Sequence, residues 1–543
     1  MTSYRTLSTW AISAALLAGA ASCADLKEAP ISGITDTYYT SAVGFDAAVN
    51  ATYSGLHRWY GRQAAFANTA FGTDEFTKGA DGAYKFFNDY TPQLTPDAQY
   101  IREPWDDLYR AINTANAVIA RAPNAQVTDA VKTQRVAEAK FLRATYYFIL
   151  VRLWGDIPLN LDETTAPRTD VTRTPKAQVY DQIIKDLTDA IAVLPATQGQ
   201  YGRATKAAAQ HQLALVYLTR ANAGDMALAA TNAKAVIADP QYGLLPNWKD
   251  LWDIKNEKNK EVVFAVQYTT DPLLADGGNS GHLYYTMQYE NQPGMQRDIP
   301  YGRAFKRFRP TPWLLGLWDR TKDSRYDDGF QTMWLANNVA TLPKVGGVPK
   351  FQVGDTAIWM PGVNVTSADS ASRRYGTWSP KDYTEAVFPT LVKYLDPTRL
   401  ALNDTAGGKD WYVARLAETY LIAAEALYRD NRAAQALPYV NAVRERAAKK
   451  SVVATTMDVT VADLSIDFFL DERSRELAGE EMRWFDLVRP MPNYPNGKLV
   501  ERVKADNPQA LAAGFIKDCH TLRPIPQTEI DRSTSGMKQN PCY

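Results

Sequence analysis

Several common sources of chemistry are scarce or missing in this sequence. The chain has 543 residues but only 3 cysteines and 4 histidines, and no histidine lies at metal-ligand spacing from another histidine or from a cysteine pair. The nucleophile elbow G-x-S-x-G, the phosphate-binding P-loop and the dinucleotide fingerprint G-x-G-x-x-G are absent. The sequence therefore indicates neither a zinc protein nor an enzyme of these motif classes.

Neither sign of charge predominates. The 60 basic and 60 acidic side chains give a formal net charge of zero, whereas nucleic-acid-binding chains normally carry a positive excess. Beyond the N-terminus, no stretch is long and apolar enough to span a bilayer. The 30 tyrosines and 13 tryptophans stand out instead, since aromatic rings suit both a large core and a surface that grips sugars or peptides.

The N-terminal residues have the pattern of an export signal. One basic residue, Arg5, precedes an apolar run and small residues that end at Cys23. This pattern predicts a signal peptide over residues 1–22, because the run is too short for a membrane span. The cysteine after Ala20, Ala21 and Ser22 resembles a bacterial lipobox, which implies lipidation of Cys23 and a lipidated tether over residues 23–40.

Two cysteines remain near the C-terminus, Cys519 and Cys542. An exported protein can join such a pair in a disulfide, but the sequence supports two free or buried thiols equally well. This alternative stays open at the level of sequence.

Helical periodicity dominates two parts of the chain. It predicts helices over residues 41–60, 104–122, 130–154, 176–194, 205–220, 227–238, 412–429 and 433–447. Pro104 marks a helix start and Gly155 a helix end, whereas residues 61–99 are expected to be irregular. Helices rich in small Ala and large Tyr or Leu recur in three places, which indicates tetratricopeptide-like helix pairs, with a generic helical bundle as the alternative.

The middle of the chain has a different composition. Residues 241–405 are rich in Gly, Pro, Asn and Asp and contain short β-type runs at 261–268 and 391–395. We therefore expect a mostly α fold in which a tetratricopeptide-like scaffold carries long loop-rich insertions and a few short β hairpins. Residues 41–240 would form its N-terminal helical region, residues 241–405 a ligand-binding insertion, and residues 406–543 would complete the scaffold.

An acid-rich segment, DERSRELAGEEMRWFDLVR at 471–489, raises the question of catalysis. Read as one helix, it places most of its acids within one turn of an arginine, for example Glu472 with Arg475 and Asp486 with Arg489. A neighbouring guanidinium lowers a carboxyl pKa and disfavours a general acid. The segment is therefore interpreted as a salt-bridge network rather than an active site, with a core-facing stripe that includes Trp484.

Two other acidic patterns also favour a structural role. Asp74 and Glu75 are adjacent, so their side chains point apart and cannot form a catalytic dyad by themselves. The segment GADGAY at 79–84 lacks the acid repeat of a calcium loop. No metal or cofactor is expected, although a structural Ca²⁺ ion in the loops stays open.

Three inserted stretches combine flat aromatic rings with polar side chains, as a sugar site requires. They are residues 81–90, 277–298 and 372–383. We predict ligand contacts at Tyr84, Phe86, Asn88, Tyr284, Tyr285, Tyr289, Arg297, Arg374, Tyr375 and Trp378. The alternative for each aromatic residue is that it packs its own loop.

Six segments in a fixed order carry a resemblance to one family. They are SCADLKEAP (22–30), WDDLYRAINTANAVI (105–119), AKFLRATYYFILVRLWGDIPL (139–159), RLAETYLIAAEAL (415–427), DERSRELAGEEMRWFDLVR (471–489) and LRPIPQTEIDRSTSGMKQNPCY (522–543). Together they resemble the SusD/RagB family of Bacteroidetes outer-membrane lipoproteins over nearly the whole chain. The sequence departs from the family pattern at Ala478, where an aromatic residue is more usual, and at Cys542, where glycine is.

The resemblance implies a surface lipoprotein of the outer membrane that faces the cell exterior. Such proteins bind a nutrient, usually a glycan and sometimes a peptide, and deliver it to a SusC-like TonB-dependent transporter without catalysis. A surface-displayed glycoside hydrolase and a pure protein-interaction scaffold are the competing hypotheses.

Overall fold

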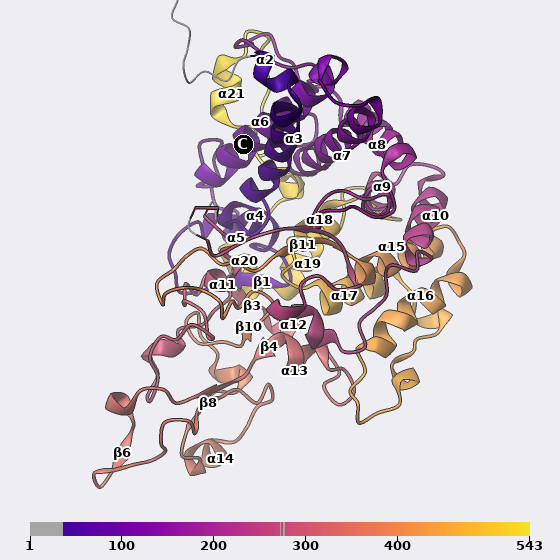
Figure 1. The fold of residues 1–543 in the computed structure, drawn as a ribbon. Coiled ribbons are helices and arrows are strands. Elements are labelled where there is room, and N and C mark those ends of the chain that lie inside the picture. Colours follow the sequence, from indigo (N-terminus) through magenta and orange to yellow (C-terminus); the bar gives the residue numbers. More distant parts are fainter. Residues whose placement is uncertain (1–35, 272, 275–276) are drawn as a thin grey trace, which may run out of the picture.

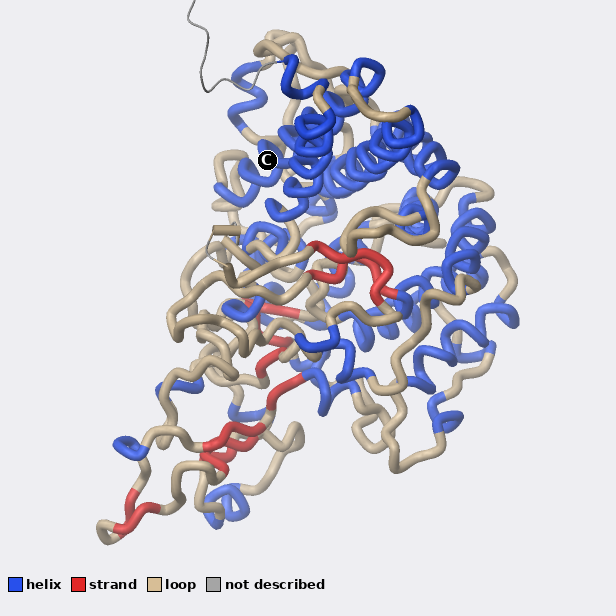
Figure 2. The backbone as a smooth tube through the Cα atoms, viewed as in Figure 1, coloured by secondary structure: helices blue, strands red, loops and turns tan. Residues whose placement is uncertain are grey.

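Successive helices packed on one another form most of the molecule (Figures 1 and 2). The computed structural model describes residues 36–271, 273–274 and 277–543. Residues 1–35, with the predicted signal peptide and lipidation site Cys23, lie outside this range. The N-terminal helices are α2 (Asp36–Thr40), α3 (Ala42–Ser54), α4 (Gln63–Thr69), α5 (Phe86–Asp89), α6 (Gln99–Arg121), α7 (Asp129–Trp154), α8 (Lys176–Val193), α9 (Lys206–Arg220) and α10 (Asp225–Ile237).

The C-terminal part continues the same stack of helices. Its helices are α15 (Leu416–Arg429), α16 (Ala433–Arg446), α17 (Ile466–Leu477), α18 (Arg483–Val488), α19 (Leu499–Asp506), α20 (Pro508–Ala513) and α21 (Gln527–Arg532). Helices α6 to α10 pack consecutively, and α10 then packs directly on α15, although a long segment separates them in sequence. Buried alanines such as Ala214, Ala233 and Ala423 allow these close approaches. The predicted helix-pair scaffold is confirmed.

The end of helix α7 lies where the sequence predicts it, whereas the predicted start of helix α6 is wrong. Helix α7 begins where the Thr128 side chain accepts the Val131 N–H and ends at Gly155, whose φ of 73° suits glycine. Helix α6 begins at Gln99, so Pro104 lies inside it rather than at its start. Proline has no N–H for the carbonyl four residues back, that of Tyr100. The Asn68 Nδ2 atom donates to that carbonyl over 2.8 Å instead.

The loop-rich middle contains short helices and strands. Its helices are α11 (Gly281–Tyr284), α12 (Pro312–Leu315), α13 (Arg325–Gly329) and α14 (Ser367–Ser372). The strands of the whole chain are β1 (Phe76–Lys78), β2 (Val262–Val266), β3 (Phe308–Pro310), β4 (Phe330–Gln331), β5 (Met333–Leu335), β6 (Lys344–Val345), β7 (Val348–Pro349), β8 (Thr356–Trp359), β9 (Gly376–Thr377), β10 (Thr390–Leu391) and β11 (Trp411–Arg415). The predicted run at 261–268 is confirmed as β2, whereas the run at 391–395 is a strand only at its first residue.

Two strand pairs tie the middle to the scaffold. β2 pairs antiparallel with β11, which occupies residues predicted as the start of a helix. β1 pairs antiparallel with β3 and sets Phe76 opposite Pro310. β1 and the helix α4 both fall in the stretch expected to be irregular, where the elements are too short for a periodic signal.

Residues 332–388, which we call the arm, project from the rest of the molecule at the lower left of Figure 1. The arm holds the three-stranded sheet β5-β8-β9 and the hairpin β6-β7. It has its own hydrophobic cluster, in which Trp334 and Ile358 are fully buried and Met287 joins from outside the arm. The arm is therefore a folded unit rather than an open loop.

The acid-rich segment is two helices, not one. α17 ends at Leu477 and α18 starts at Arg483, because Gly479 and Glu481 adopt φ of 80° and 59°. The predicted pairs Glu472–Arg475 and Asp486–Arg489 are confirmed at 2.8 and 3.6 Å. Glu480 lies within the break and pairs with residues far away in the sequence, Lys393 at 2.5 Å and Arg415 at 2.8 Å.

A buried ion network surrounds α17. Arg325 contacts Glu472 at 2.9 Å and Glu476 at 3.1 Å, and all three side chains are fully buried. Burial alone would raise the pKa of Glu476, but the guanidinium groups of Arg446, Arg415 and Arg325 lower it to about 2. The architectural interpretation of this segment is supported, because its central acids stay ionised and lie away from solvent.

The structure also resolves the alternative for the two C-terminal cysteines. Cys519 and Cys542 form a disulfide with Cα atoms 5.8 Å apart, which closes the last segment of the chain. Among the described residues, no helix is long and apolar enough to cross a membrane.

Candidate functional site

The ten predicted ligand residues divide by burial. Tyr84, Phe86, Arg297, Tyr375 and Trp378 are half-buried and Arg374 is exposed. Four others are buried: Asn88, Tyr284, Tyr285 and Tyr289. Only the first group presents side chains at the surface.

For the four buried residues, burial argues against the predicted contact with a ligand. Tyr285 is 1% exposed, and its ring lies 4.9 Å from that of Phe76 and 5.2 Å from that of Phe308. Tyr289 donates its hydroxyl to the Gly302 carbonyl over 2.7 Å, and Asn88 accepts the Gly72 N–H over 3.2 Å. Each of these side chains has its partners inside the fold and therefore belongs to the core beneath the surface. Tyr284 joins them, 5.5 Å from the Phe66 ring.

The first stretch presents an aromatic platform. The Tyr84 ring stacks on Tyr100 with centroids 3.9 Å apart and meets the Phe86 ring edge-on at 6.0 Å. Tyr84 has a φ of 62°, an unusual conformation for tyrosine, and its hydroxyl donates to Gln99 Oε1 over 2.6 Å. The local backbone and these contacts hold the ring in place at the surface.

Sequence reasoning missed the segment that lies beside this platform. The guanidinium groups of Arg303 and Arg307 lie 5.0 and 5.1 Å from the centroid of the half-buried Phe305 ring. Arg307 Nε also contacts Asp81 of the first stretch at 3.1 Å. The available signal was RAFKRFR at 303–309, in which basic and aromatic residues are interleaved.

A cavity of about 700 Å³ adjoins the same segment. Its lining includes Glu290, Asn291, Gln292, Met295, Gln296, Arg297, Asn338, Leu402 and Asn403. Arg297 Nη1 donates to Asn403 Oδ1 over 2.5 Å, and Arg303 Nη1 donates to the Asn403 carbonyl over 2.6 Å. Asn403 therefore links the cavity to the arginines around Phe305. We call this continuous surface, from Tyr84 and Phe86 through Phe305 to Arg297, the loop site.

The third predicted stretch lies elsewhere. Tyr375 and Trp378 pack against the hydrophobic cluster of the arm. Arg373, the neighbour of the predicted Arg374, stacks over Trp359 at 4.4 Å. The structure thus brings the first two stretches together and assigns the third to the packing of the arm.

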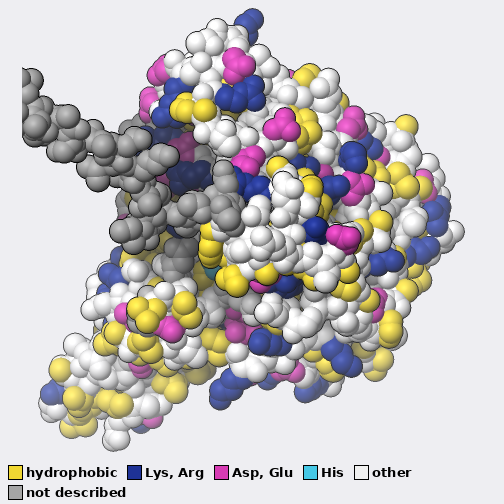
Figure 3. Space-filling view, turned by 45° about the horizontal axis from the view of Figure 1, so that its top comes forward, with side chains coloured by type: hydrophobic (Ala, Val, Ile, Leu, Met, Phe, Trp, Pro, Cys, Tyr) yellow, Lys and Arg dark blue, Asp and Glu magenta, His cyan; other side chains and the backbone are white. Residues whose placement is uncertain are grey.

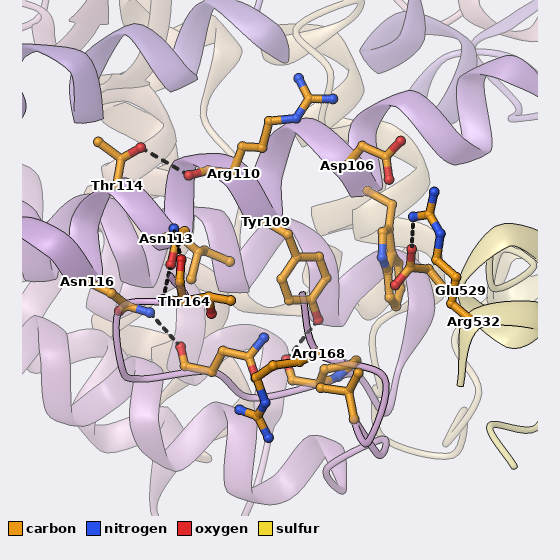
Figure 4. A pocket seen from close by; sticks show the side chains of 15 residues that line it. Asp106, Tyr109, Arg110, Asn113, Thr114, Asn116, Thr164, Arg168, Glu529 and Arg532 are labelled. Atoms are coloured by element: carbon orange, nitrogen blue, oxygen red, sulfur yellow. Dashed lines mark hydrogen bonds and ion pairs between the residues drawn. The ribbon is translucent and has the colours of Figure 1, made fainter. Parts of the chain in front are cut away.

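A second large cavity, of about 720 Å³, lies on the helical scaffold between α6, residues 158–171 and α21 (Figure 4). No predicted ligand residue lines it. Its polar groups largely bond to one another: Asn113 Nδ2 donates to the Thr164 carbonyl, Tyr109 donates to the Pro158 carbonyl, and Arg532 pairs with Glu529 at 3.3 Å. Much of the polar lining of this cavity is thus occupied by contacts within the fold.

Acids from different loops bear on the hydrolase hypothesis. Burial raises the pKa of Glu257 to about 7 and that of Asp410 to about 6. However, Glu257 Oε1 accepts the Asp410 N–H over 2.7 Å, and Asp410 Oδ1 accepts the Tyr268 N–H over 2.8 Å. Both acids thus serve as anchors for the backbone around β2 and β11. Within the described ranges, no three His, Cys, Asp or Glu side chains are grouped as a metal site requires.

Comparison with known proteins places this fold. A model described as "SusD family" matches residues 260–543, and one described as "Starch-binding associating with outer membrane" matches residues 32–218. The chain is 28% identical over 542 residues to SusD-like protein P2 of Formosa agariphila, covering 96% of this chain and 97% of that protein. It is 26% identical over 444 residues to starch-binding protein SusD of Bacteroides thetaiotaomicron, covering 77% and 74%.

Solved structures agree with these relatives. A laminarin-binding SusD-like protein superimposes with a TM-score of 0.68 at 25% identity, covering 93% of this chain and 100% of the other. The fold is also shared with surface glycan-binding protein A of Bacteroides thetaiotaomicron, solved with laminarihexaose, at a TM-score of 0.68 and 21% identity over 92% and 100% of the two chains. Because the first family model covers more than half of the sequence, this protein belongs to the SusD family.

Proposed function

We propose that this protein is a surface lipoprotein that binds a glycan at the loop site and delivers it to a SusC-like transporter without cleaving it. The observation that carries the proposal is the aromatic platform of Tyr84 and Phe86 beside the charged side chains of Asp81 and Arg307. A sugar ring has an apolar C–H face that stacks on an aromatic ring, and hydroxyl groups that pair with charged or amide side chains. The loop site offers both kinds of partner.

Relatives support a glycan over other ligands. Two solved relatives are described as binding laminarin or laminarihexaose, and a third relative as binding starch. A peptide ligand is the alternative within the family. The amide-rich lining around Arg297 suits hydroxyl groups, which both donate and accept hydrogen bonds.

The membrane and transporter parts of the proposal rest on the N-terminus and on the family. Cys23 after a signal-like segment supports a lipid anchor, and the family description of the matched model supports association with the outer membrane. We place the protein on the exterior face, where a nutrient polymer is met, with a SusC-like barrel as its partner.

Affinity electrophoresis tests the binding part. The full chain, purified in detergent, is run through gels that contain a panel of polysaccharides, and the incubated ligands are then analysed for cleavage. We expect retardation by at least one polymer without cleavage. Cleavage would favour the hydrolase, and a lack of retardation by every polymer would favour a peptide ligand or a scaffold role.

Two matched variants locate the site. Tyr84→Ala removes the platform ring and is expected to abolish retardation, whereas Trp378→Ala removes a half-buried ring of the arm and is expected to leave it unchanged. Thermal melting of both variants controls for folding. The reverse result would move the binding surface to the arm.

A further inference from the structure

The loop site has an unbalanced set of charges. The segment 303–309 contains Arg303, Lys306, Arg307 and Arg309 and no acid. Among the carboxylates of the described residues, only that of Asp81 lies within ion-pair distance of this segment, and it pairs with Arg307 at 3.1 Å. Arg303 bonds a backbone carbonyl instead. This segment therefore carries more positive charge than the fold neutralises, whereas Arg297 at the other end of the loop site is paired with Glu290 at 3.0 Å.

Two of these arginines also have donors without partners. Arg307 Nη1 and Arg309 Nε are buried and make no hydrogen bond. A buried N–H group without an acceptor is unfavourable, so the fold leaves part of the hydrogen-bonding capacity of both arginines unsatisfied. The guanidinium group of Arg303 lies 5.0 Å from the centroid of the Phe305 ring.

The aromatic ring fixes the geometry of these donors. Phe305 lies against both Arg303 and Arg307, with the two guanidinium groups 5.0 and 5.1 Å from the centroid of its ring. Guanidinium is planar and presents paired N–H donors that match the two oxygens of a carboxylate or a sulfate. Neutral hydroxyl groups do not require such an arrangement.

We infer that the glycan bound at the loop site is acidic and that its carboxylate or sulfate groups bind Arg303 and Arg307 beside Phe305. This inference rests on the proposed function. Uronic acids and sulfate esters share the chemistry that the arginines recognise, namely paired anionic oxygens on a sugar ring.

The cavity on the helical scaffold differs from the loop site in how its arginines are paired. Its three rim arginines each contact a neighbouring acid: Arg110 with Asp107 at 3.0 Å, Arg168 with Asp170 at 3.2 Å, and Arg532 with Glu529 at 3.3 Å. Each arginine of that rim is therefore neutralised by an acid of the fold. Figure 3 likewise shows basic and acidic side chains intermixed over the helical part of the face in view. An excess of arginine is a property of the loop site and not of this rim.

Binding to matched polymers tests the inference. The full chain is titrated with polygalacturonate for carboxylate, dextran sulfate for sulfate, and dextran and laminarin as neutral controls. We expect at least tenfold tighter binding to one acidic polymer than to either neutral one, and a further tenfold loss when salt rises from about 50 to about 500 mM. The polymer that binds identifies which anion is recognised.

Variants separate recognition from general charge attraction. Arg303→Met and Arg307→Met are each expected to weaken binding of the acidic polymer at least tenfold, whereas Arg532→Met on the other cavity is expected to leave it unchanged. If Arg307→Met does not fold, Arg303→Met alone decides, because Arg303 bonds only a carbonyl. An equal loss for Arg532→Met would overturn the inference in favour of nonspecific attraction.

The outcomes also distinguish the inference from the function on which it rests. Binding of laminarin or dextran alone would overturn the acidic ligand and leave a glycan-binding protein. Binding of no polymer would overturn both.

Discussion

Arginine has opposite roles in two regions of this molecule. In the scaffold, Arg325, Arg415 and Arg473 are at most 1% exposed, and carboxylates of the same fold surround them. At the loop site, Arg303 and Arg307 lie against an aromatic ring and receive one carboxylate between them. The scaffold network and the proposed binding surface therefore differ in how many carboxylates surround each arginine, rather than in how many arginines they contain.

The two regions differ for an electrostatic reason. A guanidinium that is taken out of water is costly unless anions replace the lost hydration. The scaffold provides those anions from α17, as Glu472 and Glu476 do for Arg325. The loop site leaves part of this compensation to solvent or to a ligand.

The largest expected effect comes from breaking the scaffold network. Arg325→Met leaves three buried carboxylates without their shared cation and is expected to lower the free energy of unfolding by about 3–5 kcal/mol. Chemical denaturation measures the change. Arg303→Met is the matched control, with an expected change of about 0.5 kcal/mol or less. Equal destabilisation by both variants would remove the distinction between the regions.

The second-largest effect is expected from Glu75, a buried acid whose charge the neighbouring cation offsets only in part. Burial raises the pKa of Glu75 to about 7, despite the partly opposing charge of Arg483. Its folded pKa exceeds its unfolded pKa of about 4.5, so its contribution to stability is complete below pH 4.5 and is lost as pH rises through 7. We expect a loss of about 3 kcal/mol over this range from this group. Glu75→Gln should flatten this part of the stability curve.

The acids of the scaffold network provide the opposite pH dependence. The pKa of Glu476 is lowered to about 2, so its contribution is present above pH 4.5 and is lost as pH falls towards 2. Denaturation curves between pH 3 and pH 8 therefore separate the two kinds of acid. Glu257 and Asp410 titrate in the same range, so a Glu75→Gln chain that loses as much stability as the parent chain between pH 4.5 and pH 7 would contradict the assignment.

Removing a carboxylate from the loop site is expected to increase its affinity for an acidic glycan. Asp81→Asn removes the one carboxylate that competes for Arg307 at the loop site. We expect severalfold tighter binding of an acidic glycan and a change in stability of less than about 1 kcal/mol, because the pair is partly exposed. Calorimetric titration measures the affinity. Weaker binding would mean that Asp81 itself contacts the ligand.

The smallest effect is expected at the rim of the scaffold cavity. Arg532 is exposed and pairs with Glu529 within one helical turn, and exposed pairs of this kind contribute little to stability. Arg532→Met should leave the melting temperature and the glycan affinity unchanged. A marked loss of affinity would assign the cavity of Figure 4 a part in binding.

Sequence reasoning succeeded where one periodicity runs over a long segment. Helices such as α6 and α15 have stripes of apolar residues, and their packing follows from Ala and Tyr composition. It failed at the break between α17 and α18, because the charged and apolar spacing continues across Gly479. The backbone there is determined by tertiary contacts that the spacing does not contain.

The site was predictable only in part for a similar reason. The stretch with Tyr84 and Phe86 reaches the surface as expected. Tyr284 and Tyr285 have the same composition but lie in the core, since tyrosine suits both environments. The segment with Arg303 and Phe305 was missed because it lies more than 200 residues from Asp81 in the sequence. The pairing of β1 with β3 brings the two together, with Arg307 in contact with Asp81.

The ladder between β2 and β11 has a consequence for engineering. These strands stand at the entrance and the exit of the long middle segment and are hydrogen-bonded to each other, with Trp411 opposite Val266. The segment between them is thus a cassette whose two ends are held together by the scaffold. Exchanging residues 267–410 for the corresponding segment of a relative should replace the part of the loop site that holds Arg303 and Arg307, while the Tyr84 platform and the junctions stay with this helical stack.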